Sequence, residues 1–404
     1  MKVRINPGSV RGTTKASPSK SVAHRLLLCA GLSEGTSVIH GISDSEDMKA
    51  TLDCLSAVGA VWTKEGETVT IRGTDIRKLP EHTVLRCRES GSTLRFLIPL
   101  CLLSGQTVSC RGSETLLARP LDVYQEICER QGLLFAPGKE ELVLAGPLQS
   151  GNFRVKGNIS SQFISGLLFA LPLREADSTI QLLPPVESRS YIDLTLQALR
   201  LFGVRVEWQE ERTLYIPGGQ SYQPREAEVE GDYSNAAFFA ALNTLGSQVD
   251  IEGLNPNSHQ GDRSYEHFFA MLAQGTPTIH IADCPDLGPI LFAVAAAKNG
   301  GVFTGTRRLR IKESDRAAAM AEELAKFGVA VTVRENSVVV YPAEFHAPTE
   351  PLNGHNDHRI VMALATLLTL VGGELSGAEA VAKSMPDFFE KLSALGFEVI
   401  CYDA

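Results

Sequence analysis

The chain has 404 residues, of which 44% are hydrophobic and 21% are charged, and its formal net charge is −9. This length exceeds what one hydrophobic core normally serves, so we expect two domains. The acidic balance argues against a general binder of nucleic acid or of anionic membranes, and any anionic partner must bind in a local basic pocket.

Targeting signals and cysteine usage indicate the compartment. No apolar run is long enough to span a bilayer, and the N-terminal segment lacks the apolar core of a signal peptide. The eight cysteines are scattered, without a C-x-x-C pair, and several lie within apolar runs. They are typical of reduced, buried thiols, so we predict a cytoplasmic protein without disulfides and without a metal site.

Along the chain, amphipathic helices that end in glycine recur, each followed by an extended apolar segment. The first ends at Gly59 and the last at Gly396. The others end at Gly132, Gly203, Gly275 and Gly328. Glycine suits the left-handed cap of a helix. The recurrence predicts six copies of a small α/β unit of about 67 residues each.

Most units also contain a second helix that is apolar along its length. These helices are predicted to begin near Ser19, Ser90, Ser160, Ser234, Pro285 and Asn356. A helix that is apolar all round is buried, so each domain should enclose helices within sheet and outer helices. The acidic stretch 224–231 follows three of the six glycine-capped helices and is the expected linker. The strand before Pro18 could belong to either half.

In the first half, polar and basic residues stand where the buried helices start. Ser19 can cap the first helix, with Lys20 in its first turn and Arg25 just over a turn beyond, which favours an anion site. A capped helix with two solvated cations is the alternative. Ser90-Gly91-Ser92 opens the second helix, and Gly91 would let a ligand approach the backbone.

The third buried helix opens with Ser160, Ser161 and Gln162, three short polar side chains at a positive helix end. They suit a phosphate or a polyol, although capping by one serine would explain part of the pattern. The stretch 187–191, which contains Ser188, repeats this pattern before the predicted helix 192–203. Arg119, just before Pro120, would by itself be taken as a surface residue.

In the second half, acids join the cations. Asp286 precedes a buried helix and could be a cap or a general base. The stretch 311–316 is predicted to open a helix, with Lys312 and Arg316 on one face and Glu313 and Asp315 in its first turn. A solvated helix start is the alternative.

The last buried helix opens with Asn356-Asp357-His358-Arg359. Arg359 could clamp a carboxylate or phosphate, whereas we expect His358 to be structural. Lys383 is predicted to lie at a further helix start. Convergence of these helix starts would create a cationic interdomain cleft for small anions. Asp286 and Glu313 would be candidate proton-transfer groups in cofactor-free transfer chemistry, because there is no metal-ligand pattern, P-loop or G-x-G-x-x-G motif.

Taken together, these stretches resemble those of the enolpyruvyl transferase family, and within it the EPSP synthases. The matching stretches occur in family order and cover nearly the whole chain: Lys20–Arg25, Ser90–Arg95, Arg119–Pro120, Ser160–Gln162, Tyr191–Thr195, Gly231–Ser234, Lys312–Arg316, Asn356–Arg359 and Lys383–Asp387.

The resemblance implies a fold of two inside-out α/β domains, each built from three βαβαββ units with buried helices. It places residues 19–229 in the first domain and residues 1–18 together with 230–404 in the second. It also implies a cytoplasmic monomer without a cofactor. Its partners would be two small molecules, shikimate 3-phosphate and phosphoenolpyruvate, with no nucleic acid and no membrane.

The implied reaction gives 5-enolpyruvylshikimate 3-phosphate and phosphate by addition and elimination. By motif, the residues expected to bind shikimate 3-phosphate are Lys20, Ser21, Arg25, Ser160, Ser161, Gln162, Ser188, Asp286 and Lys312. Those expected to bind phosphoenolpyruvate are Lys20, Gly91, Arg119, Gln162, Arg316, Arg359 and Lys383. The resemblance assigns catalysis to Asp286, Glu313 and Lys20, with Asp286 as the base beside the 5-hydroxyl and Glu313 handling the methylene proton.

Three positions depart from the commoner family pattern. Arg308 stands where many members have asparagine, Glu89 replaces a frequent asparagine, and Ser190 replaces a frequent proline. The alternatives are the sister enzyme that uses UDP-N-acetylglucosamine and a non-catalytic binder of phosphorylated metabolites. The first usually has a reactive loop cysteine and a Lys-Asn pair, whereas here Lys20 precedes Ser21. The intact set Lys20, Asp286, Glu313 and Arg359 argues against the second.

Overall fold

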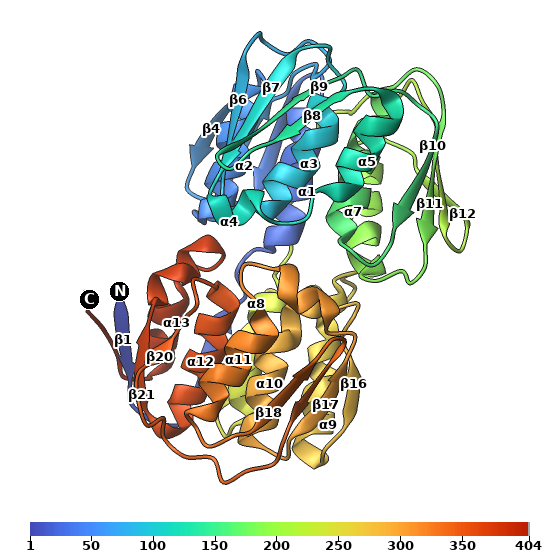
Figure 1. Cartoon of the computed structure of the whole chain (residues 1–404). Coiled ribbons are helices and arrows are strands. Elements are labelled where there is room, and N and C mark those ends of the chain that lie inside the picture. Colours follow the sequence, from blue (N-terminus) through green and yellow to red (C-terminus); the bar gives the residue numbers. More distant parts are fainter. Residues whose placement is uncertain (403–404) are drawn as a thin grey trace. The chain divides into compact units, whose positions relative to one another are not determined.

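The computed structural model describes residues 1–402. Its contacts divide the chain into a continuous unit, Lys20–Glu230, and a split unit, Met1–Ser19 with Gly231 onward. Each unit has one hydrophobic core of its own. In each, sheets lie outside a group of inner helices (Figure 1).

The continuous unit contains three four-stranded sheets of one topology. In each sheet the first two strands are parallel and the other two pair antiparallel. The first has the order β14 (Glu226–Glu228), β3 (Thr36–His40), β5 (Thr68–Arg72), β4 (Val61–Glu65). The second has the order β6 (Thr83–Arg88), β7 (Thr107–Gly112), β9 (Glu141–Ala145), β8 (Leu134–Pro137). The third has the order β10 (Asn152–Lys156), β11 (Ser178–Leu183), β13 (Thr213–Ile216), β12 (Glu207–Glu210).

The split unit repeats this topology twice and shortens it once. The full sheets are β16 (Thr278–His280), β17 (Gly301–Thr304), β19 (Ser337–Val340), β18 (Val331–Arg334), and β20 (Leu352–Asn353), β21 (Gly373–Ser376), β1 (Lys2–Ile5), β22 (Val399–Tyr402). The third pairs only β15 (Gln248–Glu252) with β2 (Arg11–Lys15). The N-terminal strands therefore belong to the split unit, which settles the question that the sequence left open.

The inner helices are those whose sequences are apolar all round. In the continuous unit they are α1 (Lys20–Gly31), α3 (Gly91–Cys101) and α6 (Ser161–Ala170), and α3 packs on α6. In the split unit they are α8 (Tyr233–Thr244), α10 (Gly288–Ala297) and α12 (His358–Val371), which pack on one another. Such helices have no face suited to water, so burial of their whole surface stabilises the fold. The prediction of buried helices is confirmed.

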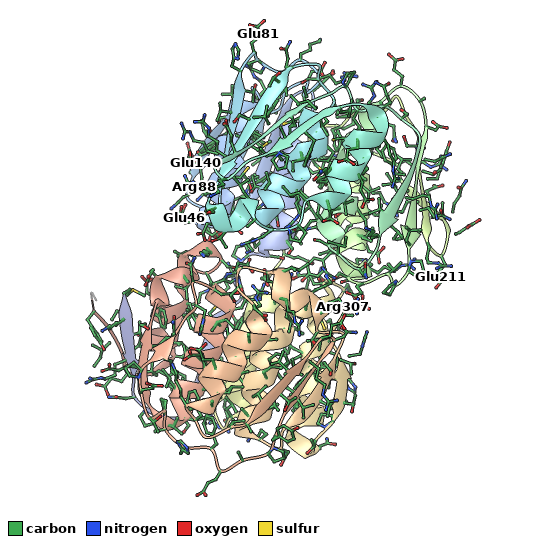
Figure 2. The ribbon with its side chains drawn as sticks, in the orientation of Figure 1. Glu46, Glu81, Arg88, Glu140, Glu211 and Arg307 are labelled. Carbon is green, nitrogen blue, oxygen red and sulfur yellow. The ribbon has the colours of Figure 1, made fainter. Side chains whose placement is uncertain are left out.

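Outer helices complete the units. They are α2 (Glu46–Ala57), α4 (Glu114–Leu117), α5 (Asp122–Gln131), α7 (Arg189–Leu201), α9 (Tyr265–Gln274), α11 (Arg316–Ala325) and α13 (Phe388–Leu395). Five of the six predicted cap glycines have positive φ: Gly59, Gly132, Gly203, Gly328 and Gly396. Gly275 follows α9 with φ of 176°, which is extended backbone, so the left-handed prediction was wrong there. Charged side chains such as Arg88 and Glu46, which form an ion pair, project from the surface (Figure 2).

Several local predictions differ from the structure. The expected linker contains β14, which pairs with β3, so residues 226–228 belong to a sheet. Helix α7 begins at Arg189, three residues before the predicted start. All eight cysteines are free, as expected, but Cys401 is exposed. Among residues 1–402, no helix has both the length and the apolar character needed to cross a membrane.

Candidate active site

In the continuous unit, α1 positions two of the predicted cations. Lys20 Nζ lies 3.1 Å from Asp47 Oδ2 on α2. Arg25, which is 3% exposed, donates from Nε to Thr195 Oγ1 (2.9 Å) and from Nη2 to the Tyr191 carbonyl (2.9 Å), both on α7. Burial lowers the pKa of Arg25 to about 10. These contacts tie α1 to its two neighbours and fix where both positive charges stand.

A chain of hydrogen bonds through one imidazole and three hydroxyl groups joins α1, α2 and α3. His24 Nδ1 lies 2.9 Å from Thr51 Oγ1, which lies 2.8 Å from Thr93 Oγ1. Thr93 Oγ1 in turn lies 2.7 Å from Ser90 Oγ, the N-cap of α3. Burial and the charges of Lys20 and Arg25 hold the pKa of His24 well below its usual value. His24 is therefore neutral, because a further positive charge beside Lys20 and Arg25 would be unfavourable in a buried position.

Replacing Thr51 with valine should lower the free energy of unfolding by about 2 kcal/mol, because it leaves His24 Nδ1 and Thr93 without their buried partner. Thr51 is fully buried, and valine has nearly the same shape. Urea denaturation would measure the loss. Serine at this position keeps the hydroxyl and should retain more of the stability, so equal losses in both variants would contradict the account.

A second group forms around the N-termini of α3 and α6. Arg95 Nη1 donates to Gln162 Oε1 (2.8 Å), and Gln162 Nε2 donates to Ser92 Oγ (2.9 Å). A Cβ atom placed on Gly91 would lie 3.0 Å from Arg119 Nη1 and 3.1 Å from Arg95 Nη1. Two guanidinium groups therefore flank the backbone of Gly91. Arg119, which looked like a surface residue in isolation, belongs to this group.

If Gly91 lies at a phosphoenolpyruvate site, as the family resemblance implies, changing it to alanine should raise the KM for that substrate severalfold. The added methyl group would meet the guanidinium ends of Arg119 and Arg95, which would have to shift by a few tenths of an ångström. Their displacement would change the position of two cations beside the backbone of Gly91. Steady-state kinetics would measure the KM, and an unchanged value would exclude Gly91 from the binding surface.

The remaining predicted residues of this unit are four serines, which lie at or near the starts of α1, α6 and α7. Ser160 caps α6 through its own hydroxyl, and Ser161 is the first residue of that helix. Ser188 is fully buried in a left-handed conformation (φ 56°) immediately before α7. For Ser21, the backbone carbonyl accepts from Arg25 Nη1 at 2.6 Å.

In the split unit, Asp286 lies at the centre of a cluster of charges. Its carboxylate lies 3.0 Å from Lys312 Nζ, 2.8 Å from Arg316 Nη1 and 3.1 Å from Arg359 Nη2. Burial alone would raise the pKa of Asp286, but Arg359, Lys312 and Arg316 together hold it well below its usual value. The 3-10 turn Pro285–Leu287 just before α10 positions this carboxylate.

Arg316 is the other hub of the cluster and is 1% exposed. Besides Asp286, it contacts Glu313 Oε2 (2.6 Å, from Nη2) and Asp357 Oδ2 (2.8 Å, from Nε). Burial opposes the charged form, yet these three carboxylates raise the pKa of Arg316. Burial also lowers the pKa of Lys312, as do the charges of Arg308 and Arg316, against the opposing effect of Asp286.

The prediction that a helix opens within residues 311–316 placed its start too early. Helix α11 begins at Arg316, and Asp315 is its N-cap, accepting from the amide of Ala318 at 3.1 Å. The cap fixes the helix start there, so Lys312 and Glu313 lie outside it and share no helical face with Arg316. Lys312 and Arg316 come together through Asp286 instead. Lys383 was predicted to lie at the start of a helix, whereas it is the last residue of a 3-10 helix. Its Nζ donates to the Asn356 carbonyl at 2.6 Å.

Sequence reasoning missed several partners in these clusters. Asp47 and Thr51 come from a helix of their own, and the sequence carries no local signal that links either to α1. Asp357 could have been recognised, because an aspartate at a helix start is a frequent N-cap, and it does accept from the Arg359 amide at 2.9 Å. It is fully buried between Arg316 and α12.

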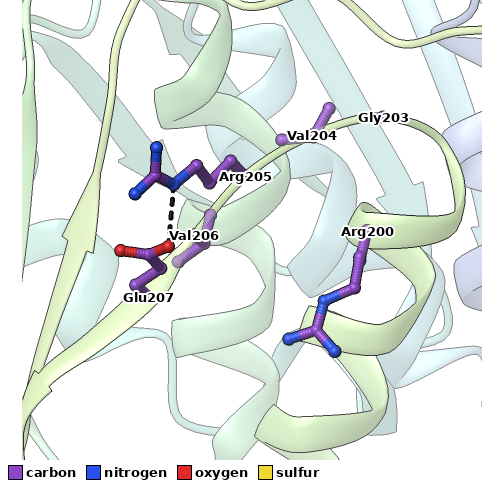
Figure 3. Close-up of a pocket in the computed structure, with 6 residues that line it drawn as sticks. All are labelled: Arg200, Gly203, Val204, Arg205, Val206 and Glu207. Carbon is purple, nitrogen blue, oxygen red and sulfur yellow. Dashed lines mark hydrogen bonds and ion pairs between the residues drawn. The ribbon is translucent and has the colours of Figure 1, made fainter.

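Two further features lie apart from these clusters. A surface hollow of about 180 Å³, between the end of α7 and β12, is lined by Arg200, Gly203–Val206 and Glu207 (Figure 3). It contains none of the predicted site residues. Glu322, Glu323 and His355 bring three possible metal ligands together, but the buried Glu323 carboxylate already pairs with Lys326 Nζ (3.0 Å) and lies 3.0 Å from His355 Nε2.

Comparison with known proteins shows which family the chain resembles over its length. The model of the family described as EPSP synthase (3-phosphoshikimate 1-carboxyvinyltransferase) matches residues 5–392. The 3-phosphoshikimate 1-carboxyvinyltransferases of Clostridium kluyveri and Clostridium perfringens are 38% and 40% identical to this chain, each over 98% of both sequences.

Solved structures agree in fold. An EPSP synthase from Acinetobacter baumannii superposes with a TM-score of 0.78 at 24% identity, over 99% of this chain and 100% of that one. The enolpyruvyl transferase NikO from Streptomyces tendae superposes with a TM-score of 0.79 at 16% identity, over 99% and 98%. Since the family model and the relatives both cover nearly the whole length, the chain belongs to the EPSP synthase family.

Proposed function

We propose that the chain transfers the enolpyruvyl group of phosphoenolpyruvate to the 5-hydroxyl of shikimate 3-phosphate, releasing phosphate. The observation that links this function to particular residues is the cluster around Asp286, where three carboxylates and three cations meet in a largely buried setting. Such a cluster can hold anions and transfer protons, which are the two demands of this reaction.

In the first step, the 5-oxygen of shikimate 3-phosphate bonds to C2 of phosphoenolpyruvate, and C3 gains a proton. Asp286 takes the hydroxyl proton, and Glu313 supplies the proton to C3. In the second step, Glu313 takes a proton back from C3, the double bond reforms and the bond from C2 to the phosphate oxygen breaks, and the departing phosphate accepts the proton held by Asp286. Lys20 offsets the charge of the departing phosphate.

Binding is divided between the units. In the continuous unit, Ser21, Arg25 and the serines at α6 would hold shikimate 3-phosphate, and the Gly91–Arg119–Gln162 group would hold phosphoenolpyruvate. In the split unit, Arg316, Arg359 and Lys383 would complete the phosphoenolpyruvate site, and Lys312 would contact shikimate 3-phosphate. Fixed cations offset the repulsion between the two anions and hold them in contact.

The test is a coupled phosphate-release assay on the purified chain. We expect phosphate only when shikimate 3-phosphate and phosphoenolpyruvate are both present. Release with UDP-N-acetylglucosamine in place of shikimate 3-phosphate would assign the chain to the sister activity. Tight binding of both substrates without release would leave a non-catalytic binder. We further propose that the enzyme acts as a monomer in the cytoplasm, which light scattering and cell fractionation would check.

A further inference from the structure

The two arginines at Asp286 are also residues proposed to bind a substrate anion. Arg316 donates to Asp286 Oδ1 at 2.8 Å, and Arg359 donates to Asp286 Oδ2 at 3.1 Å. Each arginine thus binds a different oxygen of the same carboxylate. An anionic group held by two guanidinium groups is the arrangement expected for a bound carboxylate or phosphate.

The surroundings strengthen this comparison. Arg316 and Arg359 are 1% and 4% exposed, so their charges are buried and require nearby anions. Asp357 and Glu313 bind the Nε and Nη2 side of Arg316, and Asp286 binds Nη1. Asp286 also reaches the guanidinium group of Arg359, through Nη2. Its position between the two guanidinium groups is the one an incoming anion would need.

We propose that Asp286 stands in for a substrate anion at Arg316 and Arg359, and that binding of phosphoenolpyruvate displaces it, which frees the carboxylate to act as a base. This inference rests on the proposed function. Three cations within about 3 Å make a carboxylate a weak base, because protonation would leave those cations unpaired. Transfer of two of them to the substrate removes most of that penalty, while Lys312 at 3.0 Å keeps Asp286 oriented. Base strength therefore develops only when the substrate is present.

If Asp286 competes with the substrate for the arginines, its removal should increase the affinity for phosphoenolpyruvate. Removal of an ordinary binding-site residue would lower that affinity. If ionised Asp286 competes with the substrate, Asp286→Asn should bind phosphoenolpyruvate about tenfold more tightly than the wild type, although its turnover is lost. If Asp286 instead holds the arginines in place for the substrate, the same change should weaken binding. The sign of the change in Kd distinguishes the two.

The experiment is calorimetric titration of phosphoenolpyruvate into the full chain in the absence of shikimate 3-phosphate, so that no turnover contributes heat. Asp283→Asn is the matched control, because it removes the same charge from an exposed position three residues away. We expect tighter binding in Asp286→Asn and a Kd within about twofold of wild type in Asp283→Asn. An unchanged or weaker affinity in Asp286→Asn, or equal tightening in both variants, would overturn the proposal.

A second measurement does not need the Asn variant to fold. In wild-type protein labelled with carboxyl-¹³C aspartate, phosphoenolpyruvate should shift an aspartate carboxylate stretch in the infrared difference spectrum. No shift at saturation would also overturn the proposal. The two hypotheses fail separately: tighter binding in Asp286→Asn without any wild-type phosphate release would reject the proposed function and leave the displaced carboxylate standing.

Discussion

Replacement of Arg316 with methionine should lower the free energy of unfolding of the split unit by about 3–5 kcal/mol. The guanidinium is 1% exposed and contacts Asp286, Glu313 and Asp357 at 2.8, 2.6 and 2.8 Å. Methionine fills a similar volume but leaves these carboxylates without their shared cation, and Asp357 is fully buried. Removal of one member of a buried charge cluster costs far more than loss of a surface ion pair.

The effect should depend on pH in a defined direction. In the wild type, the folded-state pKa of Asp286 lies well below its unfolded value, so its stabilising contribution is present above pH 4 and is lost as the pH falls through the folded pKa. Without Arg316, one of the three cations that hold down the pKa of Asp286 is gone, so that pKa should rise. Asp286 is then protonated at a higher pH in the variant than in the wild type, so the difference in stability between the two should shrink as the pH falls.

Hydrogen exchange of α12 amides under native conditions would report the stability of this unit separately from the other. The matched control is Arg310→Met, since Arg310 is exposed and donates to the Arg334 carbonyl at 3.0 Å. We expect the control to lose less than about 1 kcal/mol. A loss of that size for Arg316→Met would show that the carboxylates find other partners.

The features that follow from local chemistry were predictable from the sequence. Apolar stretches without a polar face, such as 290–297, predicted buried helices because such a surface is stable only when enclosed. Left-handed glycine caps were also predictable, because positive φ values such as the +66° of Gly132 suit glycine best. The prediction of a left-handed cap was wrong for Gly275, because the backbone is extended at this residue, which follows α9.

The geometry of the charge clusters was not predictable in the same way. The spacing of Lys312 and Arg316 suggested one helical face, whereas capping by Asp315 starts the helix later, and Asp286 from a distant turn brings the two cations together. The Lys20–Asp47 pair likewise depends on how two helices pack. The resemblance to the family did not indicate that cations proposed for the substrate would be paired with a proposed base.

Changing Glu313 to glutamine should reduce turnover by about 10²–10⁴-fold, because the amide cannot donate to or accept a proton from C3 of phosphoenolpyruvate. Glutamine keeps the shape of the side chain, and its oxygen can still accept from Arg316 Nη2, which lies 2.6 Å from Glu313 Oε2. Binding should therefore survive, and we expect the Kd for shikimate 3-phosphate to stay within about threefold of wild type.

Single-turnover kinetics would separate this effect from binding and product release. Glu322→Gln is the control, because it makes the same change at an exposed position on α11 and should leave turnover unaffected. The pattern of a lost rate with retained affinity is specific to a proton-transfer group. A structural role would instead lower affinity and stability together, because Arg316 would lose a partner on which the whole cluster depends. Near-normal turnover in Glu313→Gln would move the methylene proton to another group, with Lys20 the next residue to examine.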